Sequence, residues 1–360
     1  MRLLVAGGGT GGHLYPGIAV AEEVQSRGGE VLFVGTTRGI EARVVPAAGY
    51  RLELLELSGL KRVGLGKFLR GVGRLPVAFA RSRAILREFR PDVVLGVGGY
   101  ASGPLVLAAA LAGRPSAIQE QNSVPGVTNR ALGKFVRAVF IAFEAAAASF
   151  PPGKVIATGN PVRRAFRALR GEAGVAGAGA RILVVGGSQG ARAVSDLMLG
   201  AAGLFARSRG AAITIEHQTG AADRERVERA YAELGLAAQV TVKAFIDDMV
   251  AAYRAADVVL ARAGALTLAE LALAGRPAIL IPLPTAADDH QTKNAAAFAG
   301  SGAAVVLGQS STTAEELARQ LTMLLDDPPR RQKMAAAMSA LARPDAALAI
   351  VDHLERLARA

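Results

Sequence analysis

A strand, a run of glycines and a helix follow one another at the start of this chain. The apolar residues 3–6 predict a buried parallel strand. Five glycines then fall within residues 7–12, and His13 comes directly after them. An apolar periodicity predicts a helix from about residue 16 to residue 27. This order directs backbone N–H groups and the positive end of a helix toward an anion, so we expect an α/β protein with a ligand site beside the glycines.

The glycine run also matches the G-x-G-x-x-G pattern of dinucleotide-binding folds, through Gly7, Gly9 and Gly12. A dinucleotide site needs an acid at the carboxyl end of the second strand, where it binds the ribose. The predicted second strand, residues 30–36, carries its acid, Glu30, at the opposite end. The sequence therefore disfavours an NAD site and leaves the loop as open backbone against which a substrate could lie.

Length and composition limit the class of protein. The chain has 360 residues, 51% of them hydrophobic, which is enough for two domains with separate cores. No apolar run reaches the ~18 residues of a membrane-spanning helix, and no signal-peptide pattern precedes the first strand. The lack of cysteine excludes disulfides and thiolate metal sites and fits a cytoplasmic protein. The histidines at 13, 217, 290 and 353 are too scattered to suggest a zinc site.

Strand and helix patterns alternate along the chain, and this design occurs twice. In the first half, further strands are predicted at residues 30–36, 50–57, 91–100 and 115–119. A glycine–alanine stretch at 171–180 precedes a second strand–glycine–helix unit at 181–192, and strands follow at 211–216, 239–243, 257–261 and 277–283. The alternation predicts two doubly wound Rossmann-like α/β domains facing each other across a cleft. Ligands bind at the carboxyl ends of such strands, so both glycine turns are expected to point into that cleft.

Positive charge gathers in residues 58–90. This segment holds nine basic residues and one acid, and therefore eight of the twelve excess positive charges. Such a run is often a solvated helix face, but here the charges alternate with leucine, valine and phenylalanine. Mixed apolar and basic character suits an anionic membrane surface. It suits nucleic acid less well, because aromatic residues are sparse and no docking motif for nucleic acid occurs.

The second half contains the clearest pattern for a nucleotide. Residues 257–270 predict a strand, a loop at 262–264 and a helix beginning near Ala265. The N–H groups of Ala265, Leu266 and Thr267 then lie at the positive end of that helix, where a diphosphate binds well. Glu270 follows on the loop-facing side, where its carboxylate can accept two ribose hydroxyls. The alternative is that Glu270 is an exposed helix residue without a ligand.

A polar cluster begins the helix predicted after residue 288. Amide and carboxylate groups there suit sugar hydroxyls, and Gln291 is the first candidate. The alternative for Asp288 and Asp289 is capping of the helix, which is compatible with binding. No Asp-x-Asp occurs in the chain, so no carboxylate pair for a metal-bound diphosphate is evident. Charge on a leaving group would be met by backbone N–H groups and the helix dipole.

Seven motifs in this order carry a family resemblance: GGGTGGHLYPG (7–17), GVGGYASGP (96–104), EQNSVPGVTN (120–129), TGNPVR (158–163), GGSQGAR (186–192), RAGALTLAE (262–270) and DDHQTKNA (288–295). Together they span nearly the whole chain. The chain resembles the MurG family of bacterial N-acetylglucosaminyltransferases, which belong to glycosyltransferase family 28 and make lipid II of peptidoglycan. One departure is Gln119, which stands where histidine is common in the family.

The resemblance implies a GT-B fold, with an acceptor domain at 1–160 and a donor domain at 161–343. A final helix at about 344–360 would cross back onto the first domain. The implied reaction moves GlcNAc from UDP-GlcNAc to the 4-hydroxyl of the muramyl sugar of lipid I. It would proceed with inversion and without a metal or cofactor, giving lipid II and UDP. The implied location is the cytoplasmic face of the cell membrane, with residues 58–90 as a peripheral contact.

The resemblance also implies roles for single residues. Donor contacts carried over from the first half are Thr10, Gly11, Gly12, Asn122 and Arg163. Those from the second half are Ser188, Ile246, Ala265, Leu266, Thr267, Leu268, Ala269, Glu270 and Gln291. Among these, the Ile246 backbone would bind uracil and Gln291 the sugar, whereas Tyr100 would lie on the acceptor side.

The reaction needs a base beside the acceptor hydroxyl, and both His13 and Glu120 are candidates. His13 is favoured because histidine titrates near neutral pH. Its alternatives are to hydrogen-bond a phosphate or to orient the acceptor. Glu120 is either the base itself or the group that holds His13 in one tautomer.

Three rival functions remain at this point. One is a glycosyltransferase acting on diacylglycerol or another lipid, against which EQNSVPG and GVGGYASGP argue. The second is a UDP-GlcNAc epimerase, which needs no acceptor. The third is a non-enzymatic sensor that binds UDP-GlcNAc without turnover.

Overall fold

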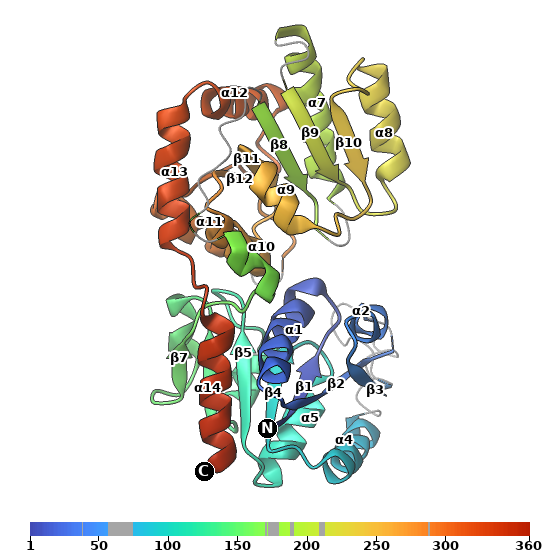
Figure 1. Cartoon of the computed structure of the whole chain (residues 1–360), viewed down its shortest axis with the longest axis vertical. Coiled ribbons are helices and arrows are strands. Elements are labelled where there is room, and N and C mark those ends of the chain that lie inside the picture. The colour runs from blue at the N-terminus through green and yellow to red at the C-terminus, as the bar shows by residue number, and fades with distance from the viewer. Residues whose placement is uncertain are drawn as a thin grey trace. The chain divides into compact units, whose positions relative to one another are not determined.

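The computed structural model describes the chain except for residues 38, 57–74, 170, 172–179, 188–190, 209–212 and 287–288. The chain divides into two compact units (Figure 1). The first unit comprises Met1–Arg164 together with Arg343–Ala360, and the second comprises Ala165–Ala342. Each unit contains one parallel sheet, and the prediction of two Rossmann-like α/β domains is confirmed.

The sheet of the first unit has the strand order β3-β2-β1-β4-β5-β6-β7. The strands are β1 (Arg2–Gly7), β2 (Glu30–Thr36), β3 (Arg51–Leu55), β4 (Val93–Gly98), β5 (Ser116–Glu120), β6 (Ala138–Ile141) and β7 (Val155–Ala157). The order reverses direction between β1 and β4. Loops leaving the carboxyl ends of these two strands therefore diverge, which opens a crevice in folds of this type.

Helices cover both faces of this sheet. They are α1 (Gly11–Ser26), α2 (Glu41–Ala47), α4 (Leu75–Phe89), α5 (Ser102–Leu111), α6 (Val127–Leu132) and α14 (Ala346–Arg359). Apolar residues of α1 and α14 share one core cluster with β1, and those of α4 and α5 share another. The central strands β1, β4, β5 and β6 are buried on both sides, which explains their mostly apolar sequences, whereas the edge strands β3 and β7 are more exposed.

Helix α1 begins at Gly11, five residues before the predicted start. Thr10 is extended and occupies the N-cap position, and its carbonyl accepts hydrogen bonds from the N–H groups of His13 and Leu14. Pro16 therefore lies inside the helix and does not begin it. Because of this shift, His13 belongs to the first turn of α1.

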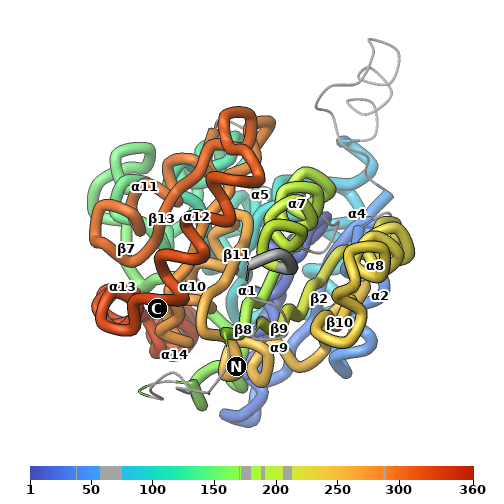
Figure 2. The backbone as a smooth tube through the Cα atoms, turned by 90° about the horizontal axis from the view of Figure 1, so that it is seen from above, coloured from blue at the N-terminus to red at the C-terminus, as the bar shows by residue number. Residues whose placement is uncertain are grey.

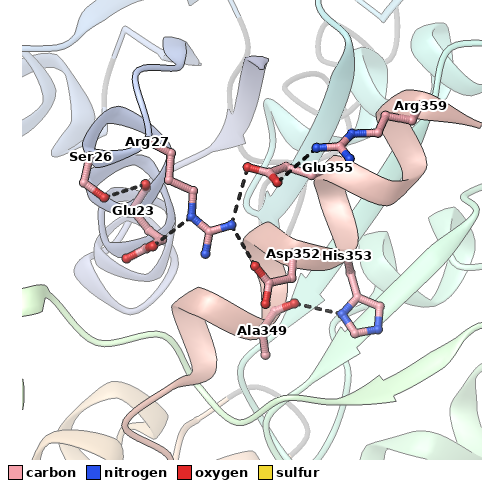
Figure 3. A network of polar contacts seen from close by, with 8 residues as sticks. All are labelled: Glu23, Ser26, Arg27, Ala349, Asp352, His353, Glu355 and Arg359. Carbon is pink, nitrogen blue, oxygen red and sulfur yellow. Dashed lines mark hydrogen bonds and ion pairs between the residues drawn. The ribbon is translucent and has the colours of Figure 1, made fainter.

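The last helix, α14, packs against α1 in the first unit. Arg27 at the end of α1 joins the two helices, as Figure 3 shows. Its guanidinium donates to Glu23 at 3.0 Å, to Asp352 at 2.7 Å and to Glu355 at 3.4 Å. The chain thus returns to its first unit through a helix with an apolar buried face and an ion-pair cluster at its edge.

The second unit has the strand order β10-β9-β8-β11-β12-β13. The strands are β8 (Ala180–Val185), β9 (Ile213–Gln218), β10 (Val240–Lys243), β11 (Val258–Ala261), β12 (Ala278–Leu280) and β13 (Ala304–Val306). The helices are α7 (Arg192–Ser208), α8 (Arg224–Glu233), α9 (Met249–Ala255), α10 (Ala265–Ala274), α11 (His290–Gly300), α12 (Ala314–Leu325) and α13 (Pro328–Ala340). Helices α7 and α12 lie side by side over the sheet (Figure 2).

Candidate functional site

The glycine loop after β1 rests on a buried carboxylate, that of Glu41. This side chain is fully buried and accepts hydrogen bonds from the Gly9 N–H at 2.7 Å and from the Thr36 N–H and hydroxyl at 2.8 Å each. A Cβ on Gly8 or Gly39 would overlap the carboxylate. Glu41 thus holds the loop in place. The sequence analysis did not predict this role of Glu41. The signal available in the sequence was the glycines Gly8 and Gly39, which leave room for the carboxylate.

His13 lies where the loop after β1 meets the ends of β4 and β5. Its Nδ1 is 3.0 Å from Oε1 of Gln121, which directly follows β5. The ring lies against Gly98 at the end of β4, where an added Cβ would come within 2.8 Å of Nδ1. The His13 side chain is partly exposed. Chain segments far apart in sequence therefore meet around this ring at the β1–β4 switch point.

Glu120 is the last residue of β5, and its carboxylate is hydrogen-bonded to the residues that follow it in the chain. It is 1% exposed and accepts hydrogen bonds from the Asn122 N–H at 3.0 Å, the Gly126 N–H at 3.1 Å and the Asn129 side chain at 2.9 Å. The group on the His13 ring is Gln121 and not Glu120. The structure therefore does not show the arrangement in which Glu120 holds His13 in one tautomer, because the Glu120 carboxylate faces backbone donors of the loop.

Other candidates of the first unit lie around the start of α1. Thr10 is exposed at the N-cap, and Gly11 and Gly12 form the first turn with His13. The Arg163 guanidinium lies 5.2 Å from the centre of the Tyr15 ring, one turn further along α1. Asn122 is partly exposed in the loop that Glu120 holds. Tyr100, after β4, is 43% exposed, so its side chain is accessible.

In the second unit, Glu270 lies on α10, whose N-cap is Gly264. Glu270 is 8% exposed, and its Oε2 accepts a hydrogen bond from the Tyr253 hydroxyl at 3.2 Å. The alternative that Glu270 is an exposed helix residue is therefore wrong. The N–H groups of Ala265, Leu266 and Thr267 belong to the first turn of α10, which has no helical acceptors for them. Leu268 and Ala269 follow in the same helix.

Two further donor candidates, Ile246 and Gln291, follow the strands β10 and β12 in the chain. The Ile246 N–H donates to Gln218 at 3.0 Å, and Gln291 accepts a hydrogen bond from the Leu283 N–H at 2.9 Å. Asp289 stands at the N-cap of α11, but its carboxylate accepts from the Thr292 hydroxyl and makes no backbone cap. Ser188 and Asp288 lie outside the described residues.

Arg262, which follows β11, forms hydrogen bonds to the segments that follow β12 and β13. Its guanidinium donates to the Ile281 carbonyl at 2.9 Å, the Pro282 carbonyl at 3.2 Å and the Gln309 side chain at 2.6 Å. Burial lowers the pKa of Arg262 from its usual value. One cation thereby fixes the exit of β11 relative to the exit of β12, next to the start of α10.

Within the described part of the chain, no group of three or more His, Cys, Asp or Glu side chains is arranged to hold a metal ion. None of the helices in that same part is both long and apolar enough to cross a bilayer.

Comparison with known proteins identifies relatives of both units. Residues 3–141 match the glycosyltransferase family 28 N-terminal domain, and residues 181–350 match the C-terminal domain of that family. A protein of Anaeromyxobacter dehalogenans (strain 2CP-C) is 51% identical over 361 residues, which cover 100% of this chain and 94% of the relative. Its name is UDP-N-acetylglucosamine–N-acetylmuramyl-(pentapeptide) pyrophosphoryl-undecaprenol N-acetylglucosamine transferase.

Two further proteins support membership of the same family. A protein of the same name from Myxococcus xanthus (strain DK1622) is 52% identical over 306 residues, covering 84% of this chain and 79% of its own. The crystal structure of MurG from Acinetobacter baumannii is 32% identical, with a TM-score of 0.76 and 99% of each chain covered.

Proposed function

The chain belongs to glycosyltransferase family 28, and from this premise we propose that it transfers N-acetylglucosamine from UDP-N-acetylglucosamine to lipid I, forming lipid II and UDP. The observation that carries this proposal is the 51% identity, over the whole chain, to a transferase named for that reaction. The two Rossmann-like units agree with the GT-B fold of such enzymes. The first unit, predicted as residues 1–160 with the helix at 344–360, is the acceptor domain. The second unit, predicted as residues 161–343, is the donor domain.

The second unit binds the donor. The first-turn N–H groups of α10 meet the diphosphate, and Glu270, held by Tyr253, accepts the ribose hydroxyls. The Ile246 backbone binds uracil. Gln291 uses its oxygen for the Leu283 N–H, which directs its amide donors toward the sugar. The family resemblance also assigns donor contacts to Ser188 of this unit and to Thr10, Gly11, Gly12, Asn122 and Arg163 of the first unit.

His13 is the general base, and Tyr100 lies on the acceptor side. Glu120 is nearly inaccessible, and its oxygens accept several N–H groups, so it is poorly placed to take a proton. His13 accepts the proton of the muramyl 4-hydroxyl while the hydroxyl oxygen forms a bond to C1 of GlcNAc. The bond from C1 to the UDP oxygen breaks, and its electron pair leaves with UDP. Attack opposite the leaving group inverts C1, and backbone N–H groups stabilise the diphosphate without a metal.

The direct test uses purified protein, UDP-GlcNAc and a soluble lipid I analogue, with and without EDTA. We expect a disaccharide product and one UDP per transfer, at the same rate in both samples. Conversion of the donor without an acceptor would favour an epimerase, and transfer to diacylglycerol in place of the analogue would favour another lipid acceptor. Binding of the donor without turnover would favour a sensor.

Glu270→Ala tests the donor assignment. The donor KM should rise, because the carboxylate that accepts the ribose hydroxyls is lost, while the acceptor KM stays unchanged. Glu233→Ala is the matched control, since Glu233 is an exposed glutamate of the same unit. An unchanged donor KM would remove Glu270 from the donor site.

The first unit also contacts the cytoplasmic face of the membrane through residues 58–90. On the described part of this segment, α4 buries Ile85, Leu86 and Phe89 and exposes Arg83 and Arg87. Val77, near its start, is 68% exposed. A helix with exposed cations and an exposed valine suits an anionic surface.

Charge reversal tests this contact. Reversal at Lys61, Arg62, Lys67 and Arg70 should weaken binding to phosphatidylglycerol vesicles, by about 1 kcal/mol for each charge that lies near the surface. Activity on the soluble acceptor should not change. Reversal of Arg224 and Arg229, exposed on α8, is the control. Equal losses in vesicle binding and in soluble activity would instead place the segment in folding or acceptor binding.

A further inference from the structure

A chain of buried amide side chains lies behind His13. Gln121 is 1% exposed and Gln119 is fully buried. The Gln121 amide nitrogen donates to the Val97 carbonyl at 2.8 Å and to Oε1 of Gln119. The Gln119 amide nitrogen donates in turn to Oδ1 of Asn160 at 3.1 Å. Three amides therefore connect the end of β5 to the segment after β7.

The surroundings of Gln121 determine which end of its amide faces His13. Val97 and Gln119 present carbonyl oxygens, which only accept hydrogen bonds, so the NH₂ group must point toward them. Oε1 is left to face Nδ1 of His13. Because Oε1 only accepts, the proton of the neutral imidazole must be on Nδ1.

The tautomer decides whether His13 can act as a base. With the proton on Nδ1, the lone pair is on Nε2, and no described residue of the chain hydrogen-bonds to that nitrogen. The ring also lies so close to Gly98 that a Cβ added there would come within 2.8 Å of Nδ1, which leaves no room for a side chain at that position. Nε2 is thus the nitrogen open to an incoming hydroxyl.

The orientation of the three amides also affects His13 after the ring has accepted the proton of the hydroxyl. All three amides turn their oxygen toward His13 and their nitrogen away from it. The negative ends of these dipoles therefore face the ring when it becomes an imidazolium, and each hydrogen bond polarises the next. A neutral chain thereby fills the place that a carboxylate takes in Ser-His-Asp triads.

We propose that Gln121, supported by Gln119 and Asn160, is a positioning residue that holds His13 in the Nδ1–H tautomer and so presents Nε2 to the acceptor hydroxyl. This inference rests on the proposed transferase function for its catalytic consequence. The tautomer itself can be observed without turnover.

The test combines ¹⁵N-histidine NMR of the full chain with steady-state kinetics. In the wild type, His13 should show a protonated Nδ1 and an unprotonated Nε2. In Gln121→Met, which keeps the side-chain length but cannot hydrogen-bond, the ring should become a mixture of tautomers. We expect kcat to fall about 10- to 100-fold with an unchanged donor KM, as for loss of one buried hydrogen bond.

Two further variants separate positioning from a general effect on folding. Gln121→Glu can still accept from Nδ1, so it should restore the Nδ1–H tautomer and part of kcat. Its second carboxylate oxygen would face three carbonyl oxygens, two of Gln119 and one of Val97, and should lower the melting temperature. Gln25→Met, an exposed glutamine on the same helix as His13, should leave tautomer and kcat unchanged.

The outcomes that overturn the proposal are distinct from failure of the proposed function. A proton on Nε2 in the wild type, or a tautomer unaffected by Gln121→Met, rejects the amide chain as the orienting device. A shifted tautomer with unchanged kcat rejects its role in the reaction. If the wild type shows the expected tautomer but does not transfer GlcNAc to lipid I, the transferase function fails while the orientation of His13 stands.

Discussion

The side chains of His13 in the first unit and His217 in the second unit lie in opposite environments. His13 is partly exposed in the first unit and has one ring nitrogen bonded to Gln121. His217 is fully buried on β9 of the second unit, with Nε2 3.2 Å from the Ser195 hydroxyl and Nδ1 3.0 Å from the Tyr231 hydroxyl. Burial lowers the pKa of His217 from 6.5 to about 4.

This difference shows that the hydrogen-bond partners and the solvent exposure of a histidine decide whether its ring can take part in a reaction. A serine, a histidine and a tyrosine in contact look like catalytic machinery, but both ring nitrogens of His217 are engaged and water cannot reach them. No described residue hydrogen-bonds to Nε2 of His13, which lies at the β1–β4 switch point of its sheet, where ligands bind in folds of this type. This contrast supports the proposed catalytic role of His13 and indicates that His217 stabilises the second unit.

The largest expected effect comes from His13→Ala. If His13 is the general base, as proposed, its loss should lower kcat by about two to four orders of magnitude, with little change in thermal stability. Turnover of the soluble lipid I analogue is the measurement, and His353→Ala, on α14, is the control. Activity close to wild type, together with an inactive Glu120→Gln, would exchange the roles of the two candidates.

An intermediate effect is expected from the titration of His217. The unfolded histidine takes up a proton near pH 6.5, whereas the folded one does so only near pH 4, so the unfolded state binds more protons between these values. The contribution of neutral His217 to stability is thus complete above pH 6.5 and is lost as pH falls to 4. It amounts to about 3 kcal/mol.

Urea unfolding at several pH values between 7 and 4 measures this contribution. The free energy of unfolding should fall less steeply in His217→Gln, which cannot titrate, than in the wild type. Identical slopes in the wild type and His217→Gln would mean that another group controls stability in acid.

The smallest effect is expected from Tyr231→Phe. The ring packing stays, but Nδ1 of His217 loses its partner, so the unfolding free energy at pH 7 should drop by about 1 to 3 kcal/mol. Activity at pH 7 should not change. A loss of turnover without a loss of stability would show that the buried cluster affects catalysis, and would remove the distinction between the two histidines.

Sequence patterns predicted much of the fold but few of the side-chain contacts in the candidate site. The apolar runs and glycine turns indicated both parallel sheets, because a strand buried on two faces has a continuous apolar sequence. Apolar periodicity predicted the start of α1 at about Pro16, yet Thr10 takes the N-cap earlier. Gln121, Glu41 and Tyr253 had no assigned role, since no local pattern marks a residue whose partner is distant.

The sequence by itself determined the two α/β units, the positions of the glycine turns and the family, because these depend on local periodicity and on ordered motifs. The tertiary structure alone decided which group faces His13, how Glu120 is used and that Glu270 is buried beside Tyr253. His13 and Gln121 are 108 positions apart and meet only because β1, β4 and β5 are neighbours in the sheet. Hydrogen-bond partners follow from strand order, and strand order is a property of the whole fold.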